Sequence, residues 1–452
     1  MKTQKKSRPI NPIRLVSKLG SDVLILGAGA AGLACASYLN RVGLTVTILE
    51  ARARLGGRIH TVRPAIASPP LELGAEFIHG TPEISLGRFE KLTLPFFDVI
   101  DDHIYRNGTK LESRDDFFKT ISEIMQLLRQ PSSHKKDRTV EMFLASSKLT
   151  KTKRDLFTSF VEGFHAADTA KMSELGLAST EESDESELNG ISSFRTIYGY
   201  DGLVRALEQE AQNAKIHLNH EVIRIQWKKG LVHVRTRNTL TGIYQTFEAR
   251  RVVVTIPIGV LKAGTIEWSP FPRSLEPALK AIEMGHAIRL IFQFESRFWE
   301  SLSKKPVSYL HASSRHYFPT WWTFAPMRVP YLVAWQGGPK ADDLSKRTHH
   351  EIVHMALSTL AHITGHKISV IEKQVVAMFH HNWSRDSYSR GAYSYLSHGG
   401  YRSWRRLLSP IEDTLYFAGE ATAEGPSRGT VHGALLSGRR SARQIARAIG
   451  QN

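Results

Sequence analysis

Residues 23–58 read VLILGAGAAGLACASYLNRVGLTVTILEARARLGGR, and this stretch decides the fold. An apolar run typical of a buried strand leads into Gly27-Ala28-Gly29-Ala30-Ala31-Gly32, which has the pattern GxGxxG, then into a helix and a second strand that ends at Glu50. The first glycine permits a tight turn, the second lets a pyrophosphate approach the helix N-terminus, and the third permits close packing of helix on strand. The acid is placed to accept hydrogen bonds from a ribose diol. The stretch predicts a Rossmann-like α/β dinucleotide site.

A second glycine turn, Leu55-Gly56-Gly57-Arg58, follows Glu50 almost at once. The first motif alone admits NAD, NADP or FAD. The second turn would bring more backbone and a permanently charged guanidinium to the same phosphates, which suits a cofactor that stays bound. It therefore favours FAD. We expect contacts to the cofactor from Gly27, Gly29, Ala31, Gly32, Glu50, Ala51, Arg52, Gly57 and Arg58.

Three segments of the chain are similar to motifs of one known family. They are EARARLGGRI at 50–59, LGAEFIHG at 73–80, and LYFAGEAT with GTVHGALLSG at 415–438. The family is the FAD-dependent amine oxidases, which include monoamine oxidases, polyamine oxidases and the flavin histone lysine demethylases. The resemblance extends from about residue 20 to 448. It implies an FAD-binding domain in three pieces, 20–95, 216–272 and 396–448, and an interleaved α+β substrate-binding domain, 96–215 and 273–395, after a basic tail, 1–19.

The C-terminal motif has the order strand, carboxylate, loop and helix start. Glu420 could hold ribityl or ribose hydroxyls, and the amides near Thr430 and Val431 begin a helix whose positive end can stabilise charge on a reduced flavin. A glycine-rich cap on a core helix is the structural alternative. With the resemblance, this adds as cofactor contacts Gly74, Ala75, Glu76, Val222, Gly419, Glu420, Thr430 and Val431.

Residues 383–395, WSRDSYSRGAYSY, resemble the segment that supplies half of the family's aromatic cage. The resemblance implies that Tyr393 is the cage tyrosine, whose ring face orients an amine before the flavin. A core tyrosine with a satisfied hydroxyl is the alternative. The other cage wall falls at Thr430, as in demethylases. Ala392 replaces the cysteine that attaches flavin in monoamine oxidases, so FAD should be noncovalent.

Arg289 matches the family lysine that holds a water near flavin N5. Arginine is permanently charged and forked, so it keeps positive charge there but loses the compact geometry of lysine. This departure puts fast reoxidation by oxygen in doubt. Alternatively, Arg289 pairs with a carboxylate beneath the sheet.

The resulting hypothesis is hydride transfer from the carbon next to an amine nitrogen onto flavin N5, which gives an imine that water hydrolyses. The catalytic candidates are Tyr393, Arg289 and Thr430. The electron acceptor is O2, with release of H2O2, or another acceptor. A flavin dehydrogenase or desaturase, or a non-catalytic flavoprotein with a basic face for nucleic acid, are the alternatives. The small-molecule amine is expected to meet His79, His165, Asp168, Trp383 and Tyr393.

Composition fits a globular chain of two domains, with 452 residues, 41% hydrophobic and 23% charged. No apolar run is long enough to span a membrane, and no apolar segment follows the basic first 18 residues as a secretory signal requires. The single cysteine, Cys35, allows no internal disulfide and suits the reducing cytoplasm. The net charge of +17 comes without a zinc-finger, RNP or helix-turn-helix signature, so nucleic acid is not expected as a partner. The acidic run 181–187 is expected to be a solvated loop.

The middle of the chain alternates between helical and strand periodicity. Helices are expected within 117–163, at 203–213 and at 346–362, and strands at 217–237, 247–256, 287–294, 307–311, 320–324, 331–335 and 375–379. The strand at 251–257 should return to the flavin domain. His350-Glu351-Ile352-Val353-His354 matches the zinc motif HExxH, but only Glu372 could supply a third ligand, so no metal is expected.

Overall fold

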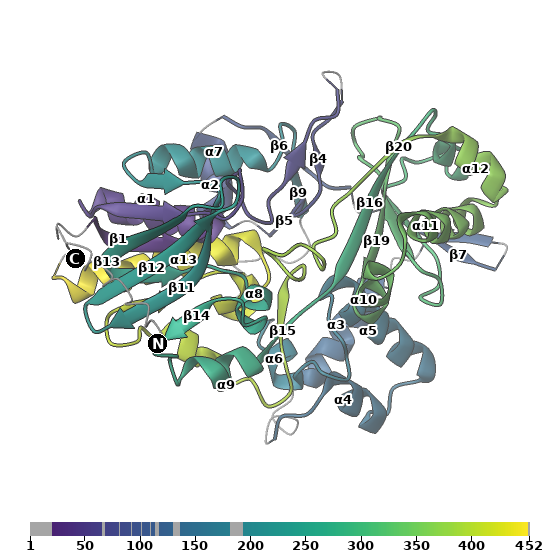
Figure 1. Ribbon diagram of the computed structural model, residues 1–452. Helices are drawn as coiled ribbons and strands as arrows, with labels where there is room; N and C mark the ends of the chain where they lie inside the picture. Colours follow the sequence, from purple (N-terminus) through teal and green to yellow (C-terminus); the bar gives the residue numbers. More distant parts are fainter. Residues whose placement is uncertain are drawn as a thin grey trace, which may run out of the picture.

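The first glycine turn joins β1 (Ser21–Leu26) to α1 (Ala30–Arg41) in the lobe on the left of Figure 1. β1 lies between β2 (Val46–Leu49) and β13 (Tyr244–Val254), and β10 (Lys215–His217) and β22 (Leu415–Phe417) pair with β2 and β13. All four pairings are parallel. β1 and β2 are almost wholly buried because a parallel sheet is covered on both faces. The predicted return of 251–257 to this sheet is confirmed.

The structure, a computed structural model, describes residues 20–65, 68–80, 82–91, 93–100, 102–108, 110–113, 117–129, 136–180 and 193–450. The basic tail 1–19 and the acidic run 181–187 lie outside the described residues.

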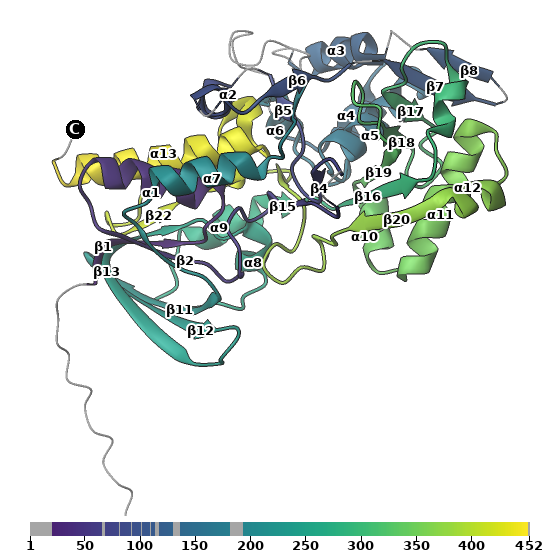
Figure 2. The same cartoon turned by 90° about the horizontal axis from the view of Figure 1, so that it is seen from above.

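Three helices cover one face of the parallel sheet, and Figure 2 shows them side by side: α1, α7 (Asp201–Glu210) and α13 (Val431–Ala448). A Cβ atom on Gly438 would lie 2.1 Å from the carbonyl oxygen of Ala31, so α13 and α1 touch backbone to backbone. A Cβ atom on Gly32 would lie 2.0 Å from the carbonyl oxygen of Gly27. The third glycine of the motif therefore permits the close packing of helix on strand that the sequence predicts.

An antiparallel ribbon branches from the first half of β13. It contains β12 (Leu231–Asn238) and β11 (His220–Lys228), and β14 (Glu267–Ser269) pairs with β11 in parallel. α8 (Ile258–Lys262), α9 (Leu275–Lys280) and the 3-10 helix η3 (Trp404–Leu408) pack with this ribbon around a second core. In the structure, α7 and α9 pack against the nucleotide lobe. The domain boundaries expected from the sequence assign both helices to the substrate domain, and these boundaries remain a prediction.

A seven-stranded sheet forms the second lobe, on the right of Figure 1. Helices α10 (Pro339–Ser345), α11 (His349–Thr364) and α12 (Ile368–Gln374) bury one of its faces. The five strands predicted between 287 and 379 are confirmed, and two others, β7 and β8, were not predicted. Its strands in spatial order are β20 (Val375–His380), β16 (Ala287–Phe294), β19 (Tyr331–Gly337), β18 (Thr320–Trp322), β17 (Tyr309–His311), β7 (His103–Asn107) and β8 (Lys110–Ser113).

A helical subdomain lies below this sheet and has its own core. It consists of α3 (Phe117–Leu128), α4 (Val140–Ser146), α5 (Lys151–Phe164) and α6 (Glu174–Ala178). Thr139, Thr150 and Ser173 cap the last three by accepting a backbone N–H. The predicted helical region 117–163 is therefore three helices, because these caps start new ones.

Short strands join the lobes. β15 (Ile282–Met284) pairs with β21 (Ser394–Leu396), and β9 (Ser193–Thr196) lies between β5 (Ile78–His79) and β6 (Phe96–Asp98). In the described part of the chain no helix is both long and apolar enough to cross a bilayer. The remaining elements are β3 (Thr61–Val62), β4 (Leu71–Glu72), α2 (Glu83–Lys91), and the 3-10 helices η2 (Phe298–Leu302), η4 (Glu420–Thr422) and η5 (Gly425–Ser427).

Candidate cofactor and substrate site

Glu50 closes the first glycine turn from the end of β2. Its carboxylate accepts hydrogen bonds from the backbone N–H of Ala28 and of Arg52, each 2.8 Å long. Burial raises the pKa of Glu50, and these two bonds act in the opposite direction. Two bonds leave further acceptor positions on the carboxylate, so Glu50 can still receive ribose hydroxyls as the sequence predicts.

The two glycine turns form one structure, which we call the two-turn cradle (Gly27–Gly29 and Gly56–Arg58). The N–H of Gly56 donates to the carbonyl of Ala28 at 2.9 Å, and a Cβ atom on Gly57 would lie 3.4 Å from the Cα of Gly29. A Cβ atom on Gly29 would have no atom within 4 Å among the described residues. α1 begins there without a side-chain cap or an acidic residue in its first turn. Free N–H groups facing open space suit a pyrophosphate.

Arg58 links the cradle to the C-terminal motif. Its Nη1 donates to the carbonyl of Ala392 at 2.7 Å and to Glu420 Oε1 at 2.9 Å, and the hydroxyl of Ser394 donates to Glu420 Oε2 at 2.7 Å. Segments more than 300 residues apart in sequence therefore meet at this arginine.

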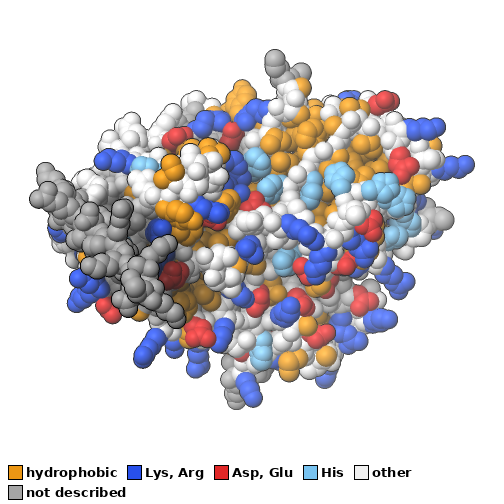
Figure 3. Space-filling view, in the orientation of Figure 1, with side chains coloured by type: hydrophobic (Ala, Val, Ile, Leu, Met, Phe, Trp, Pro, Cys, Tyr) orange, Lys and Arg blue, Asp and Glu red, His pale blue; other side chains and the backbone are white. Residues whose placement is uncertain are grey.

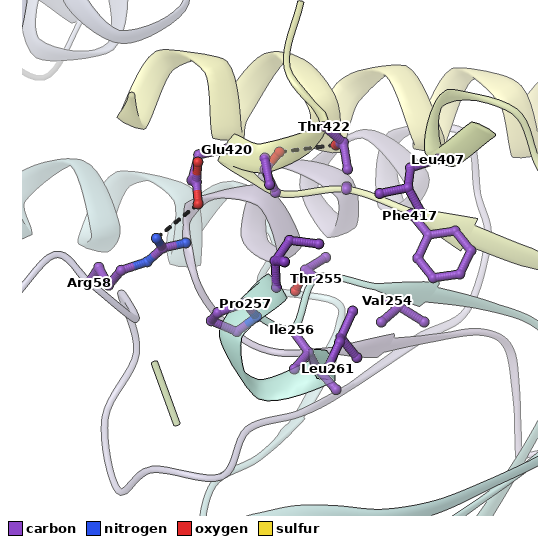
Figure 4. Close-up of a pocket in the computed structure, with 14 residues that line it drawn as sticks. Arg58, Val254, Thr255, Ile256, Pro257, Leu261, Leu407, Phe417, Glu420 and Thr422 are labelled. Atoms are coloured by element: carbon purple, nitrogen blue, oxygen red, sulfur yellow. Dashed lines mark hydrogen bonds and ion pairs between the residues drawn. The ribbon is translucent and has the colours of Figure 1, made fainter. Parts of the chain in front are cut away.

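A cavity of about 20 Å³ lies beside this link (Figure 4), where Arg58 and Glu420 point toward each other. Gly419, a predicted contact, lines it, and so do Thr255, Pro257, Phe417 and Ala418, which were not predicted as contacts. Ligands bind beyond the carboxyl ends of strands in open parallel sheets. Applied to β13, which ends before Thr255, and to β22, which ends at Phe417, this rule would have found them.

Thr430 begins α13 as its N-cap residue. Its hydroxyl accepts from the N–H of Gly433 at 3.0 Å and donates to the carbonyl of Ser427 at 2.6 Å. Tyr393 lies against the same turn, because a Cβ atom on Gly429 would be 3.6 Å from its Cδ2. The structure thus brings Tyr393 and Thr430 together. The Tyr393 hydroxyl donates to the carbonyl of Phe164 at 2.7 Å, and burial raises its pKa, so the hydroxyl is also satisfied as in a structural tyrosine.

Three histidines border the same region. The ring of His79 lies 5.7 Å from that of Phe164, and its Nδ1 is 3.2 Å from the hydroxyl of Ser193. Burial lowers the pKa of His79, His165 and His432 to about 4 each, so all three are neutral at pH 7. His432, in the first turn of α13, was missed, although it stands two residues after Thr430 in the motif.

Two other predicted substrate residues make structural contacts. Asp168 accepts from the N–H of Ala170 at 3.0 Å and lies 3.6 Å from the Lys171 ammonium. Trp383 donates from its indole nitrogen to the carbonyl of Leu73 at 2.7 Å and packs on His381. These contacts within the protein explain the positions of both side chains, and no substrate is needed to explain them.

The adenosine-side candidates lie around Glu50. Val222 is buried at an irregularity of β11 between residues 222 and 224, and the N–H of His220 donates to the carbonyl of Glu50 at 2.7 Å. Arg52 instead directs its guanidinium at Asp386, with two bonds of 2.9 and 2.7 Å. Ala51, between these residues, is partly exposed.

Arg289 is buried and pairs with Glu76, and its Nη1 donates to the carbonyl of Gly74 at 2.8 Å. A second guanidinium, that of Arg195, lies 2.9 Å from Glu76 Oε1, and the indole of Trp322 donates to Oε2 at 3.1 Å. The alternative expectation for Arg289, pairing with a carboxylate, is what the structure shows. Glu76, expected as a cofactor contact through a family motif, has both oxygens engaged by protein groups. Arg195 was not predicted.

The Arg52–Asp386 ion pair supports a prediction about stability. Burial raises the pKa of Asp386, but hydrogen bonds from His381 and Arg52 outweigh it and lower that pKa. Such a carboxylate stabilises the fold fully above its unfolded pKa, near 3.8, and loses the effect as the pH falls below that value. We expect Asp386→Asn to lower the free energy of unfolding by about 2 kcal/mol at pH 7, with a smaller difference near pH 3.

Chemical denaturation of both proteins at the two pH values measures this difference. Glu276→Gln, which removes an exposed helical pair with Lys280, is the control and should leave stability almost unchanged. An equal effect of the two substitutions would contradict the prediction.

The HExxH residues have other roles. Glu351 closes a capping box with Thr348, and His354 lies 3.6 Å from Glu372. The residues that the structure describes contain no group of three side chains suited to a metal ion. On the face shown in Figure 3, Lys and Arg side chains are scattered among Asp and Glu rather than gathered in one patch.

Comparisons with known proteins find similar sequences and similar folds. The model of the family "Flavin containing amine oxidoreductase" matches residues 30–446. "Lysine-specific histone demethylase 1 homolog 3" of Arabidopsis thaliana is 28% identical, and the alignment covers 98% of this chain but 31% of that protein. "Polyamine oxidase 2" of the same plant is 27% identical, with 92% of this chain and 86% of that protein covered.

The solved structures show the same fold. A putrescine oxidase bound to putrescine superposes with a TM-score of 0.79 at 21% identity, over 94% of this chain and 99% of the other. Cyclohexylamine oxidase from Brevibacterium oxydans also gives 0.79, at 20% identity, over 95% and 100%. The predicted α/β fold, a Rossmann-like FAD-binding domain with an interleaved α+β domain, is confirmed.

Proposed function

Because the chain belongs to the flavin-containing amine oxidoreductase family, we propose that it is an FAD-dependent enzyme that oxidises a small amine. The observation that carries the proposal is the meeting of Tyr393 with the Gly429–Thr430 turn, at the start of α13, close to the residues that bind Arg58. This arrangement supports an amine site next to the proposed cofactor site. The first two demethylase relatives are much longer than this chain, which covers 31% and 52% of them.

The residues present fit FAD. The two-turn cradle offers uncapped N–H groups and open space for phosphates, and Glu50 keeps acceptor positions for a ribose. At the other end, α13 begins beside Tyr393 with its positive end directed at the same region. The one cysteine, Cys35, is buried in α1, and Ala392 stands where covalent attachment requires a thiol, so FAD is held noncovalently.

Bound FAD supplies the acceptor for a hydride from the carbon next to the amine nitrogen, which leaves an imine for water to hydrolyse. The protein's residues orient and desolvate the amine. The ring of Tyr393 offers a face to the nitrogen, while the small side chain of Thr430 leaves the opposite wall open. His79, His165 and His432 are neutral, and aromatic and neutral walls favour the uncharged amine that hydride transfer requires.

The acceptor that reoxidises the flavin is either O2, which yields H2O2, or another oxidant. The pairing of Arg289 with Glu76 supports an oxidant other than O2, because an arginine held by a carboxylate stands where the family has the lysine that holds a water near flavin N5. The single cysteine, which permits no internal disulfide, supports the cytoplasm as the place of action. A small amine is the expected partner, and the scattered charge in Figure 3 gives no support to a nucleic acid.

A panel of amines tests the proposal. The purified yellow protein is mixed anaerobically with primary, secondary and polyamine substrates, and flavin bleaching is followed; H2O2 is then measured in air. Bleaching with peroxide supports an oxidase, and bleaching without peroxide supports a dehydrogenase. If no amine bleaches a protein that carries FAD, amine oxidation is excluded for the panel.

Tyr393→Ala tests the cage assignment. We expect flavin reduction by the best amine to slow about tenfold or more, because the amine loses its orienting ring, while FAD content changes little. Rapid-mixing absorbance gives the rate, and absorbance of the bound flavin gives the content. Tyr198→Ala, at a tyrosine that is 58% exposed, is the matched control. Parallel loss of FAD and rate would mean that Tyr393 is structural.

A further inference from the structure

The Arg195–Glu76–Arg289 cluster joins three elements: β9, the 73–77 loop and β16. Both guanidiniums contact the one carboxylate of Glu76, and the side chains of all three are about 5% exposed. Arg195 also donates from Nη1 to the carbonyl of Thr323 at 2.7 Å. Two buried cations that share one anion leave excess positive charge, which is costly inside a protein unless a further partner compensates it.

The excess charge is only partly met by a second carboxylate. Burial lowers the pKa of Arg289 to about 9, and the nearby carboxylate of Glu72 opposes that shift. Burial also raises the pKa of Glu72 to about 7, so Glu72 is only partly ionised at neutral pH. Arg195 Nη2 and Arg289 Nε are buried and have no hydrogen-bond partner among the described residues. Unpartnered N–H groups on buried guanidiniums indicate that an acceptor belongs there.

Backbone contacts connect the cluster to the two-turn cradle. Arg289 donates to the carbonyl of Gly74, and the next N–H, that of Ala75, donates to the carbonyl of Arg58 at 3.2 Å. A Cβ atom on Gly74 would lie 1.8 Å from the same Arg58 carbonyl oxygen. One residue therefore separates the excess charge from the part of the cradle that binds Glu420 and Ala392.

We propose that the Arg195–Glu76–Arg289 cluster is the positive partner of the reduced flavin, with Arg195 as a positioning and charge-supplying residue. A hydride brings one proton and two electrons to the neutral oxidised ring, so the reduced ring carries one negative charge unless a second proton binds. The excess charge of the cluster compensates that negative charge. Glu76 holds both guanidiniums in place and at the same time reduces their effect. This inference rests on the proposed binding of FAD.

Two substitutions that shift the redox equilibrium of the flavin in opposite directions distinguish this role from a structural one. Arg195→Met removes a cation but keeps the aliphatic stem, and should lower the ratio of reduced to oxidised flavin at a fixed potential about tenfold, or 30 mV for a two-electron couple. Glu76→Gln removes the anion at nearly constant shape and should raise the ratio by a similar factor. Equilibration of each holoenzyme with a redox dye measures the ratio. Arg328→Met, at an arginine whose side chain is 72% exposed, is the control and should change it less than twofold.

Each outcome decides the proposal. Shifts of opposite sign in the two variants support it. Shifts of the same sign, or ratios within twofold of the parent in both, overturn it, and Glu76→Gln decides alone if Arg195→Met does not fold. A protein that holds FAD and bleaches with amines but shows no shift refutes only this inference. A protein that binds no FAD refutes the proposed function itself.

Discussion

Gly32→Ala is expected to prevent stable folding of the nucleotide lobe, whereas Gly29→Ala should fold normally and lose FAD affinity about a hundredfold. At Gly32 the added Cβ would lie 2.0 Å from the carbonyl oxygen of Gly27, in a turn that cannot move without displacing β1, and we expect a cost of about 4 kcal/mol or more. At Gly29 the Cβ meets no described atom within 4 Å, and φ is −75°, which alanine adopts freely. It would occupy the space that the pyrophosphate needs.

Thermal unfolding of the apoproteins and fluorescence titration with FAD separate the two effects. Gly29→Ala should change the free energy of unfolding by less than about 1 kcal/mol. Gly230→Ala is the control for a glycine outside the site, where a Cβ also has open space. Because Gly230 has φ of 75°, this control should lose some stability but no FAD affinity. Normal FAD affinity in Gly29→Ala would show that the phosphates bind elsewhere.

The protein is expected to lose stability below pH 6.5 because of three histidines that are largely shielded from solvent. Burial lowers the folded pKa of His79, His165 and His432 from 6.5 to about 4. Between these values the unfolded chain binds protons that the folded chain excludes. The contribution of these three histidines to the free energy of unfolding should therefore be constant above pH 7 and should fall as the pH decreases from 6.5 toward 4. At pH 5 each histidine costs at most roughly 2 kcal/mol, and the three together about 6.

Urea denaturation at pH 8, 6 and 5, at a fixed FAD concentration, measures this slope. His165→Gln should reduce it by about one proton, because the buried Nε2 of His165 has no hydrogen-bond partner among the described residues and glutamine stays neutral. His350→Gln, at an exposed histidine of α11, is the matched control and should leave the slope as it is. A slope that starts only below pH 4.5 would show that carboxylates, not these histidines, cause the acid lability.

Local pattern predicted most of the fold. The glycine turn, the strand 287–294 and the helix that became α11 were found because periodicity and turn residues act over a few positions. β7 and β8 were missed because their strands are short and partly polar, and they join the second sheet only through pairing with β17. That pairing is set by contacts more than 200 residues away.

The candidate site was predictable where a residue's role depends on the backbone. Gly29, Gly57 and Thr430 lie where the motifs imply, because turns and caps are local. Side-chain partners were less predictable. Arg52 pairs with Asp386, and Glu76 with Arg195 and Arg289, because each of these charges is partly or wholly shielded from solvent and takes the nearest opposite charge in the folded chain. The spacing of these residues in the sequence does not indicate which of them pair.

The bond between Arg58 and Glu420 joins two parts of the chain that are synthesised at different times. The half of the site that contains Arg58 is made 362 residues before Glu420, and α13 follows Glu420. Until then β13 has an unpaired edge where β22 will lie, and α1 has an uncovered face where α13 will pack. The proposed cofactor would therefore complete its contacts only after α13 has been synthesised. A chain interrupted before β22 would expose both surfaces to aggregation and degradation.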